Sequence, residues 1–268
     1  MDVPENNLFS FAGNDGTIYF MGKKSGVLYC LEHAKLKKID AISPIQKKQS
    51  EFVFLRGIVN TNKLIIPFRW ETKVYIYNTD TKKSMIKQLG NTCGIVDASY
   101  FDNDLFFLLE NGEIIKTDLE FANIEKISNH LSEQKKIRYP YRYIIVHNQE
   151  IFLFPMYYKT ITKVHMKNWT SADLAVEKYF YLNSGYNIYK FADNNKINNV
   201  AVLQSLCTTG FLLNLNSCTV ENFLNLDAEN ERLDVFLKQL KNKEHTIQNQ
   251  KAGAVIWKTL NERIGVLS

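Results

Sequence analysis

Apolar runs recur along the chain at a nearly constant spacing. Five of them begin at residues 17, 63, 104, 150 and 199, so that successive starts are 46, 41, 46 and 49 residues apart. Each belongs to a unit with the same order of segments: a strand-like run, a polar turn, the apolar run, a loop, a third run and a turn into a weaker fourth run. Short apolar runs bounded by turn residues predict β-strands, so each unit predicts four strands.

The runs occupy matching offsets within the units. The second runs cover residues 17–20, 63–68, 104–108, 150–154 and 199–203. The third runs cover residues 27–31, 73–77, 113–116, 162–166 and 210–214, and fourth runs include 84–88 and 220–224. Several alternate apolar and polar residues at period two, which is typical of strands with one buried face.

The turns before the second runs have the composition of β-hairpins. They cover residues 13–16, 60–62, 102–103, 147–149 and 194–196, where Asn, Asp and Gly are frequent. These residues tolerate the positive φ that tight hairpins require. The pattern therefore predicts that first and second strands pair as hairpins in every unit.

A repeat of about 40–50 residues with four strands resembles the β-propeller proteins of the Kelch and WD40 type, over roughly residues 7–226. The resemblance rests on spacing and strand order, since the Gly-His…Trp-Asp motif and the Kelch double glycine are both missing. It implies an all-β propeller over residues 1–226, with about five four-stranded blades, or six if one is incomplete. A sandwich of unrelated hairpins is the alternative.

The pattern changes after residue 226. Leu233, Phe236, Leu237 and Leu240 fall at helical spacing on one stripe, and a second helical pattern runs from Ala252 to Ile264. We expect residues 227–268 to form a helical C-terminal extension packed on the propeller. The extension would cap the propeller or cover an exposed sheet edge. An arm that binds a partner is the alternative.

Composition limits the classes of function. Hydrophobic residues make up 45% and charged residues 23%, which excludes a disordered chain; the aromatic fraction is 13%. A net charge of +5, with basic clusters scattered between apolar runs, argues against a nucleic-acid surface. With no stretch of about 20 apolar residues and no signal peptide, we expect a soluble, cytoplasmic chain without membrane insertion, unless a leader has been removed.

The usual motifs of cofactor and metal sites are missing from the sequence. There is no phosphate-binding loop, dinucleotide turn or nucleophile elbow, and the five histidines lack metal-ligand spacing. None of the four cysteines forms a C-x-x-C pair, so we expect reduced, structural thiols. We expect no cofactor and no metal. The oligomeric state stays open.

Two loops between second and third runs differ from the plain turns elsewhere. They are Pro67–Thr72, with Arg69, Trp70 and Glu71, and Pro155–Thr160, with Tyr157, Tyr158 and Lys159. The resemblance implies that such loops share the ligand-binding face of a propeller with the connections between blades. Tyr141 and Arg142, at the start of the fourth unit, would lie near the same rim. The alternative is that the rings only fill space, with Arg69 paired to Glu71.

Aromatic rings beside cationic groups suit a protein partner or a glycan. We therefore predict a non-catalytic binding or scaffold module that uses this loop face. The alternative is a glycan-active propeller enzyme, a lyase or a hydrolase. Glu71 is the one acid in the two loops, whereas a glycosidase needs a pair of carboxylates.

Overall fold

Five four-stranded antiparallel sheets make up the described part of the chain. The computed structural model describes residues 8–12, 17–32, 35–42, 53–55, 57–60, 62–90, 93–127, 139–156, 160–176, 186–193, 196–204 and 210–224. The first sheet contains β1 (Leu8–Ala12), β2 (Ile18–Gly22), β3 (Val27–Glu32) and β4 (Lys35–Ala41). The second contains β5 (Ile58–Asn60), β6 (Lys63–Pro67), β7 (Lys73–Asn78) and β8 (Lys83–Gln88).

The remaining sheets follow the same plan. The third contains β9 (Ile95–Phe101), β10 (Asp104–Leu109), β11 (Ile114–Asp118) and β12 (Ile124–Ile127). The fourth contains β13 (Tyr141–His147), β14 (Glu150–Pro155), β15 (Thr160–His165) and β16 (Ser171–Ala175). The fifth contains β17 (Tyr186–Asp193), β18 (Lys196–Gln204), β19 (Gly210–Asn214) and β20 (Val220–Leu224).

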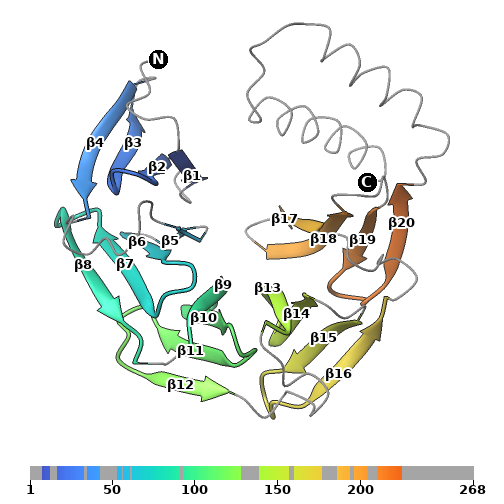
Figure 1. Cartoon of the computed structure of the whole chain (residues 1–268). Helices are drawn as coiled ribbons and strands as arrows, with labels where there is room; N and C mark the ends of the chain where they lie inside the picture. Colours follow the sequence, from blue (N-terminus) through green and yellow to red (C-terminus); the bar gives the residue numbers. More distant parts are fainter. Residues whose placement is uncertain are drawn as a thin grey trace, which may run out of the picture.

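The sheets are arranged as in a β-propeller. Within each sheet the four strands pair in sequence order, so every connection joins spatial neighbours. Figure 1 shows the sheets following one another around an arc, with the first strand of each nearest the centre and the fourth at the periphery. The all-β propeller predicted from the repeat is confirmed at this level, because the predicted second and third runs coincide with the second and third strands.

Two of the predicted hairpin turns are described in full and have the expected backbone. In the β9–β10 hairpin, Asp102 and Asn103 have φ of 50° and 67°. In the β13–β14 hairpin, Asn148 and Gln149 have φ of 45° and 63°. Two successive residues at positive φ give a turn whose twist matches that of the flanking strands. The other predicted turns lie wholly or partly outside the described residues.

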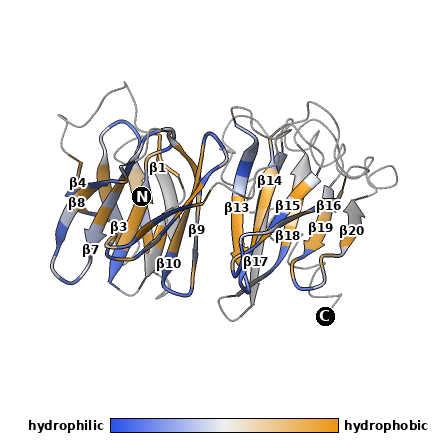
Figure 2. Cartoon of the chain, turned by 90° about the horizontal axis from the view of Figure 1, so that it is seen from below, coloured by the Kyte–Doolittle hydropathy of each residue, from blue (hydrophilic) through white to orange (hydrophobic). Residues whose placement is uncertain are grey.

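The middle strands bury both of their faces. Leu105, Phe106, Phe107 and Leu108 of β10 are all fully buried, whereas the outer strand β8 is exposed along most of its length. A middle strand has a neighbouring sheet on each side, so it needs an unbroken apolar run. The alternating pattern of a strand with one buried face therefore does not describe β10. Figure 2 shows mostly hydrophobic strands joined by more hydrophilic turns.

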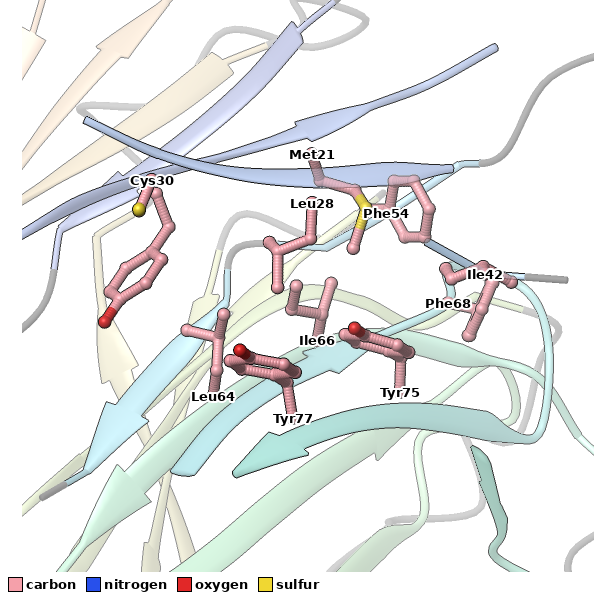
Figure 3. Close-up of a cluster of buried hydrophobic side chains, with 11 residues drawn as sticks. Met21, Leu28, Cys30, Ile42, Phe54, Leu64, Ile66, Phe68, Tyr75 and Tyr77 are labelled. Atoms are coloured by element: carbon pink, nitrogen blue, oxygen red, sulfur yellow. The ribbon is translucent and has the colours of Figure 1, made fainter. Parts of the chain in front are cut away.

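Four hydrophobic clusters join the sheets in sequence. They lie between the first and second, second and third, third and fourth, and fourth and fifth sheets. In the first of these, Met21 and Leu28 face Ile66 and Tyr75 across the gap between two sheets (Figure 3). Each sheet is thus held mainly by its neighbours.

Polar groups also connect neighbouring sheets. The Tyr75 hydroxyl donates a hydrogen bond to the Asp40 carboxylate of the first sheet. Asp97 of β9 accepts a hydrogen bond from the Ile144 amide of β13 at 2.9 Å. Because β13 pairs only with β14, a side chain from the next sheet satisfies a backbone donor on the free edge of β13.

No disulfide joins the cysteines that the structure describes. Cys30 is buried in the cluster between the first two sheets, as expected for a small apolar residue, while Cys93 and Cys218 are partly exposed. Cys207 and the predicted helical segment 227–268 lie outside the described residues. Within the described part of the chain, no helix is long and apolar enough to cross a membrane.

Replacing Phe107 by alanine tests this packing. Phe107 is fully buried between the second and third sheets, where its ring stacks on Phe121 with centroids 6.2 Å apart. We expect Phe107→Ala to lower the free energy of unfolding by about 3–5 kcal/mol in urea titrations followed by circular dichroism. Met85→Ala, on the exposed outer strand β8, should change it by less than about 0.5 kcal/mol. Equal effects of the two variants would contradict the arrangement.

Candidate functional site

One face of the propeller collects the loops between second and third strands. In an antiparallel sheet in which strands pair in order, this loop lies at the same end as the start of the first strand. The β6–β7 loop and the starts of β9, β13 and β17 therefore belong to one side of the molecule, which we call the loop face. The predicted grouping of these segments is thus a consequence of the observed topology.

The Arg69–Trp70 segment is hydrogen-bonded to the next sheet. The Trp70 amide donates to the Ile95 carbonyl of β9 at 2.7 Å, and the Ile95 amide donates to the Glu71 carbonyl at 2.9 Å. The Arg69 amide donates to the Val53 carbonyl at 2.8 Å. Backbone contacts on both sides therefore fix the β6–β7 loop.

Gly94 makes this close approach possible. A Cβ atom placed on Gly94 would lie 2.4 Å from the Trp70 carbonyl carbon and 2.5 Å from its oxygen. Both are backbone atoms, so no side-chain rotation could relieve the overlap. Glycine is required here because the two backbones touch.

Trp70 is both strained and exposed. Its φ is 62°, in the left-handed region that L-residues with large side chains rarely adopt, and half of its surface is exposed. The Arg69 guanidinium lies over the Trp70 ring, with its carbon 4.8 Å from the ring centroid. The Arg69 Nε atom is buried and has no hydrogen-bond partner in the structure. The loop therefore presents a cation and a large ring side by side.

Arg142, Tyr143 and Tyr186 form a second group on the loop face, from β13 and β17. The Arg142 guanidinium carbon lies 5.3 Å from the Tyr143 ring centroid and 5.6 Å from that of Tyr186. The two rings meet edge to face with centroids 5.7 Å apart. The Tyr143 hydroxyl donates to the Tyr186 carbonyl at 3.2 Å, and the Tyr186 hydroxyl donates to the Pro155 carbonyl.

The pKa values of the two phenols indicate which charges surround them. Burial raises the pKa of Tyr143. The Asp97 carboxylate also raises this pKa, whereas the Arg142 and Arg69 guanidinium groups lower it. Burial also raises the pKa of Tyr186 well above its usual value. Both phenols therefore stay neutral near pH 7 and act as hydrogen-bond donors. Arg69 and Arg142, from the second and fourth sheets, both lie close enough to Tyr143 to influence it.

The structure brings together only part of the predicted site. Arg69 and Trp70 lie in the β6–β7 loop, and Arg142 lies on the same face, near the start of β13. Glu71 pairs with Lys73, Oε2 to Nζ at 3.0 Å, so the Arg69–Glu71 pair of the space-filling alternative is not formed. Tyr157, Tyr158 and Lys159 lie outside the described residues.

Tyr141 occupies a different position from the one predicted. It is 1% exposed and packs in the cluster between the third and fourth sheets. Its hydroxyl donates to Thr162 Oγ1 at 3.2 Å. The side chain belongs to the core and is removed from the candidate binding surface, because a register irregularity between Tyr141 and Tyr143 places Tyr141 on the same side of β13 as Ile144, opposite to Tyr143.

Tyr143, Tyr186 and Asp97 were missed by the sequence analysis. All three lie near the start of a first strand, whereas the unusual aromatic and cationic residues of the sequence stand out in the loops between second and third strands. Aligning the starts of the first runs in the five units would have placed Tyr143 and Tyr186 near the same rim. The contact between Arg142 and Tyr186 depends on the angle between two sheets, which residue spacing does not encode.

The described residues contain no group of three or more His, Cys, Asp or Glu side chains that could hold a metal ion. The two carboxylates of the site already have partners. Glu71 pairs with Lys73, and Asp97 accepts the Ile144 amide. Apart from these carboxylates, the site offers guanidinium groups and aromatic rings, which bind anions and apolar surfaces.

Comparison with known proteins gives the fold. No protein family model matches the sequence, and no curated protein matches it. Virginiamycin B lyase from Staphylococcus aureus has a similar structure, with 12% identity, a TM-score of 0.60, and coverage of 84% of this chain and 72% of that one.

Two further structures are similar. BamB from Moraxella catarrhalis has 12% identity and a TM-score of 0.52, with 81% of this chain and 60% of that chain covered. A chain of the mitotic checkpoint complex has 9% identity and a TM-score of 0.52, with 82% and 71% covered. At these identities the likeness supports the propeller fold and leaves the function open.

Substituting Gly94 tests the contact that holds the Trp70 loop. Gly94→Ala should displace the loop from β9, lower the free energy of unfolding by about 1–3 kcal/mol and shift Trp70 fluorescence, read with Trp169 and Trp257 replaced by Phe. Gly90→Ala is the control: its φ is 72° with open space around Cβ, so it should cost about 1 kcal/mol and leave the fluorescence unchanged. An unshifted spectrum in Gly94→Ala would contradict the assigned contact.

Proposed function

We propose that the chain is a non-catalytic binding or scaffold module that recognises a protein partner or a glycan through its loop face. The binding surface would consist of Arg69, Trp70 and Arg142, with Tyr157, Tyr158 and Lys159 from the β14–β15 loop. The propeller would supply a rigid frame, since the loop is hydrogen-bonded to its neighbours. The propeller-like neighbours include both a lyase and a subunit of a protein complex, so the fold is compatible with either class.

The conformation of Trp70 is the observation that carries this proposal. A large side chain at φ 62° costs about 1–2 kcal/mol of conformational free energy. Half of the Trp70 surface is exposed, so the protein also lacks part of the stabilisation that burying the ring would give. Strained residues with exposed apolar surface concentrate at binding sites, where a ligand recovers the cost. The other exposed large apolar residues of the described chain are Met85 and Ile124, on outer strands, and Ile18, at the start of β2.

Binding without catalysis agrees best with the surrounding charges. Glycoside hydrolysis uses two carboxylates about 5–10 Å apart, one of which acts as a proton donor. Glu71 and Asp97 are instead engaged by Lys73 and by the Ile144 amide. A glycan-active lyase or hydrolase remains the second candidate, because one structural neighbour is a lyase.

We propose further that residues 227–268 complete the propeller, which would then need no sixth blade. No hydrophobic cluster of the described residues joins the fifth sheet to the first, and Figure 1 shows a gap between the two ends of the arc. The outward faces of these end sheets are apolar. Phe20 and Tyr29 pair on the side of the first sheet that faces away from the second, and Ala201 and Leu212 pair on the corresponding side of the fifth.

The C-terminal segment fits this position. β20, the last described strand, belongs to the fifth sheet, so the chain enters this segment from one of the two end sheets. The predicted helix carries one apolar stripe, containing Leu233 and Leu237, which could cover an apolar sheet face. A second copy of the chain is the competing occupant.

Removing the rings of the loop face tests the proposed function. We expect Trp70→Ala, Tyr157→Ala to fold normally and to lose at least about tenfold in affinity for ligands selected from a glycan array and a randomised peptide library, as for hot-spot residues. Met85→Ala is the matched control, since it also removes an exposed apolar side chain. Unchanged binding by the double variant would contradict the site. Turnover of a bound glycan, detected as released product, would favour the enzyme.

Cross-linking tests the position of the C-terminal segment. A photoreactive residue at Phe236 should cross-link to the first or the fifth sheet within one monomer, because the apolar stripe would face them. Leu233→Asp, Leu237→Asp should lower the thermal midpoint and expose apolar surface to a fluorescent dye, whereas Asn242→Asp on the opposite side of the predicted helix should not. Cross-links between two chains would show that a second copy occupies the gap.

A further inference from the structure

We infer that the loop face binds an acidic segment of a protein partner, with a carboxylate bound by Arg69 and Arg142 and an apolar neighbour against Trp70. The inference rests on the proposed function and narrows it from a protein or glycan to an acidic peptide.

Within the described part of the chain, neither arginine has a counter-ion. Among the described residues, neither guanidinium forms an ion pair with a carboxylate: Arg69 lies against the Trp70 ring, and Arg142 against the rings of Tyr143 and Tyr186. The acid next to Arg69 in the sequence, Glu71, is bound to Lys73 instead. Guanidinium groups held against rings, with no carboxylate partner among the described residues, keep donors available for a ligand carboxylate.

The hydrogen bonding of Arg69 is incomplete. Its Nε atom is buried and has no acceptor, and a buried donor without a partner is rare in folded proteins. A carboxylate can accept from Nε and a terminal nitrogen of the same guanidinium at once. The half-exposed Trp70 ring lies against this guanidinium, so a ligand that contacts the ring would lie close to the guanidinium of Arg69.

The charges around the site are predominantly positive. Arg69 and Arg142 both influence Tyr143, and Asp97 is the acid that acts on the same phenol. One Asp97 oxygen already accepts the Ile144 amide at 2.9 Å. Glu71 is neutralised by Lys73, and Glu110 of the β10–β11 loop accepts the Tyr139 hydroxyl at 3.1 Å, so the acids near the two guanidinium groups are engaged. The guanidinium groups therefore leave a site beside an exposed ring that attracts anions.

The available donors and acceptors favour an acidic peptide over a neutral sugar. Sugar hydroxyl groups need acceptors as well as donors, whereas the guanidinium groups offer donors alone and the Glu71 and Asp97 carboxylates are already engaged. Trp and Arg side by side are the residues that contribute most to protein interfaces. A peptide carboxylate next to an apolar side chain matches this pair, and an acidic glycan is the competing ligand.

Selection from a randomised library of twelve-residue peptides tests the inference. Peptides enriched by the full chain should contain Asp or Glu beside an apolar residue, and replacing those acids by Asn or Gln should abolish binding. Arg69→Gln and Arg142→Gln should each weaken binding of an enriched peptide about tenfold, with the loss reduced at high salt. Lys83→Gln, on the exposed outer strand β8, removes the same charge and should leave affinity unchanged.

The outcomes separate the inference from the proposed function. Peptides that lose binding in Trp70→Ala but not in Arg69→Gln, Arg142→Gln would support the binding face and overturn the carboxylate assignment. Binding that survives all three substitutions would overturn both. Oligogalacturonate that binds the chain and displaces the enriched peptide would show an acidic glycan as the ligand and overturn the choice of a peptide. Circular dichroism melting curves of each variant show whether the fold is retained.

Discussion

The structure depends on one constraint: the middle strands of each sheet are apolar on both faces, so each sheet needs a neighbour on both sides. β10 shows this most clearly, because residues 105–108 are all fully buried between the second and fourth sheets. The hydrophobic clusters between successive sheets are therefore the main source of stability. For the outward faces of the first and last sheets, the described residues supply no neighbouring sheet.

The loop face follows from this arrangement. Packing sheets side by side brings the β6–β7 loop against the start of β9, and it brings Asp97 of β9 against the free edge of β13. These contacts fix the backbone around Arg69 and Trp70, so their side chains are presented on a rigid frame. The strained φ of Trp70 persists because hydrogen bonds to Ile95 hold it in place.

Much of the fold could be predicted from the sequence, because hydrophobic runs and turn residues report directly on strands and hairpins. The spacing of the apolar runs predicted the second and third strands, and Asp102–Asn103 predicted a tight hairpin that the structure contains. Of the site, the sequence identified Arg69, Trp70 and Arg142. It misplaced Tyr141, because the direction of a side chain at the start of a strand depends on register.

The contacts between sheets could not be predicted from the sequence. Tyr143 and Tyr186 are 43 residues apart in the sequence but are in contact in the structure, and the Arg142 guanidinium lies over both rings. These contacts depend on the angle and distance between two sheets. The requirement for Gly94 has the same origin, because only the approach of Trp70 from the second sheet excludes a Cβ atom there.

The central claim is that ligands bind at the loop face, and hydrogen–deuterium exchange with and without a selected ligand tests it most directly. We predict that the ligand slows exchange in peptides covering residues 68–72 and 141–143. Exchange in the outer strand β8 and in the turn at residues 147–149, on the opposite face, should be unchanged. Protection confined to the outer strands or to that opposite turn, with none around Trp70 and Arg142, would contradict the account.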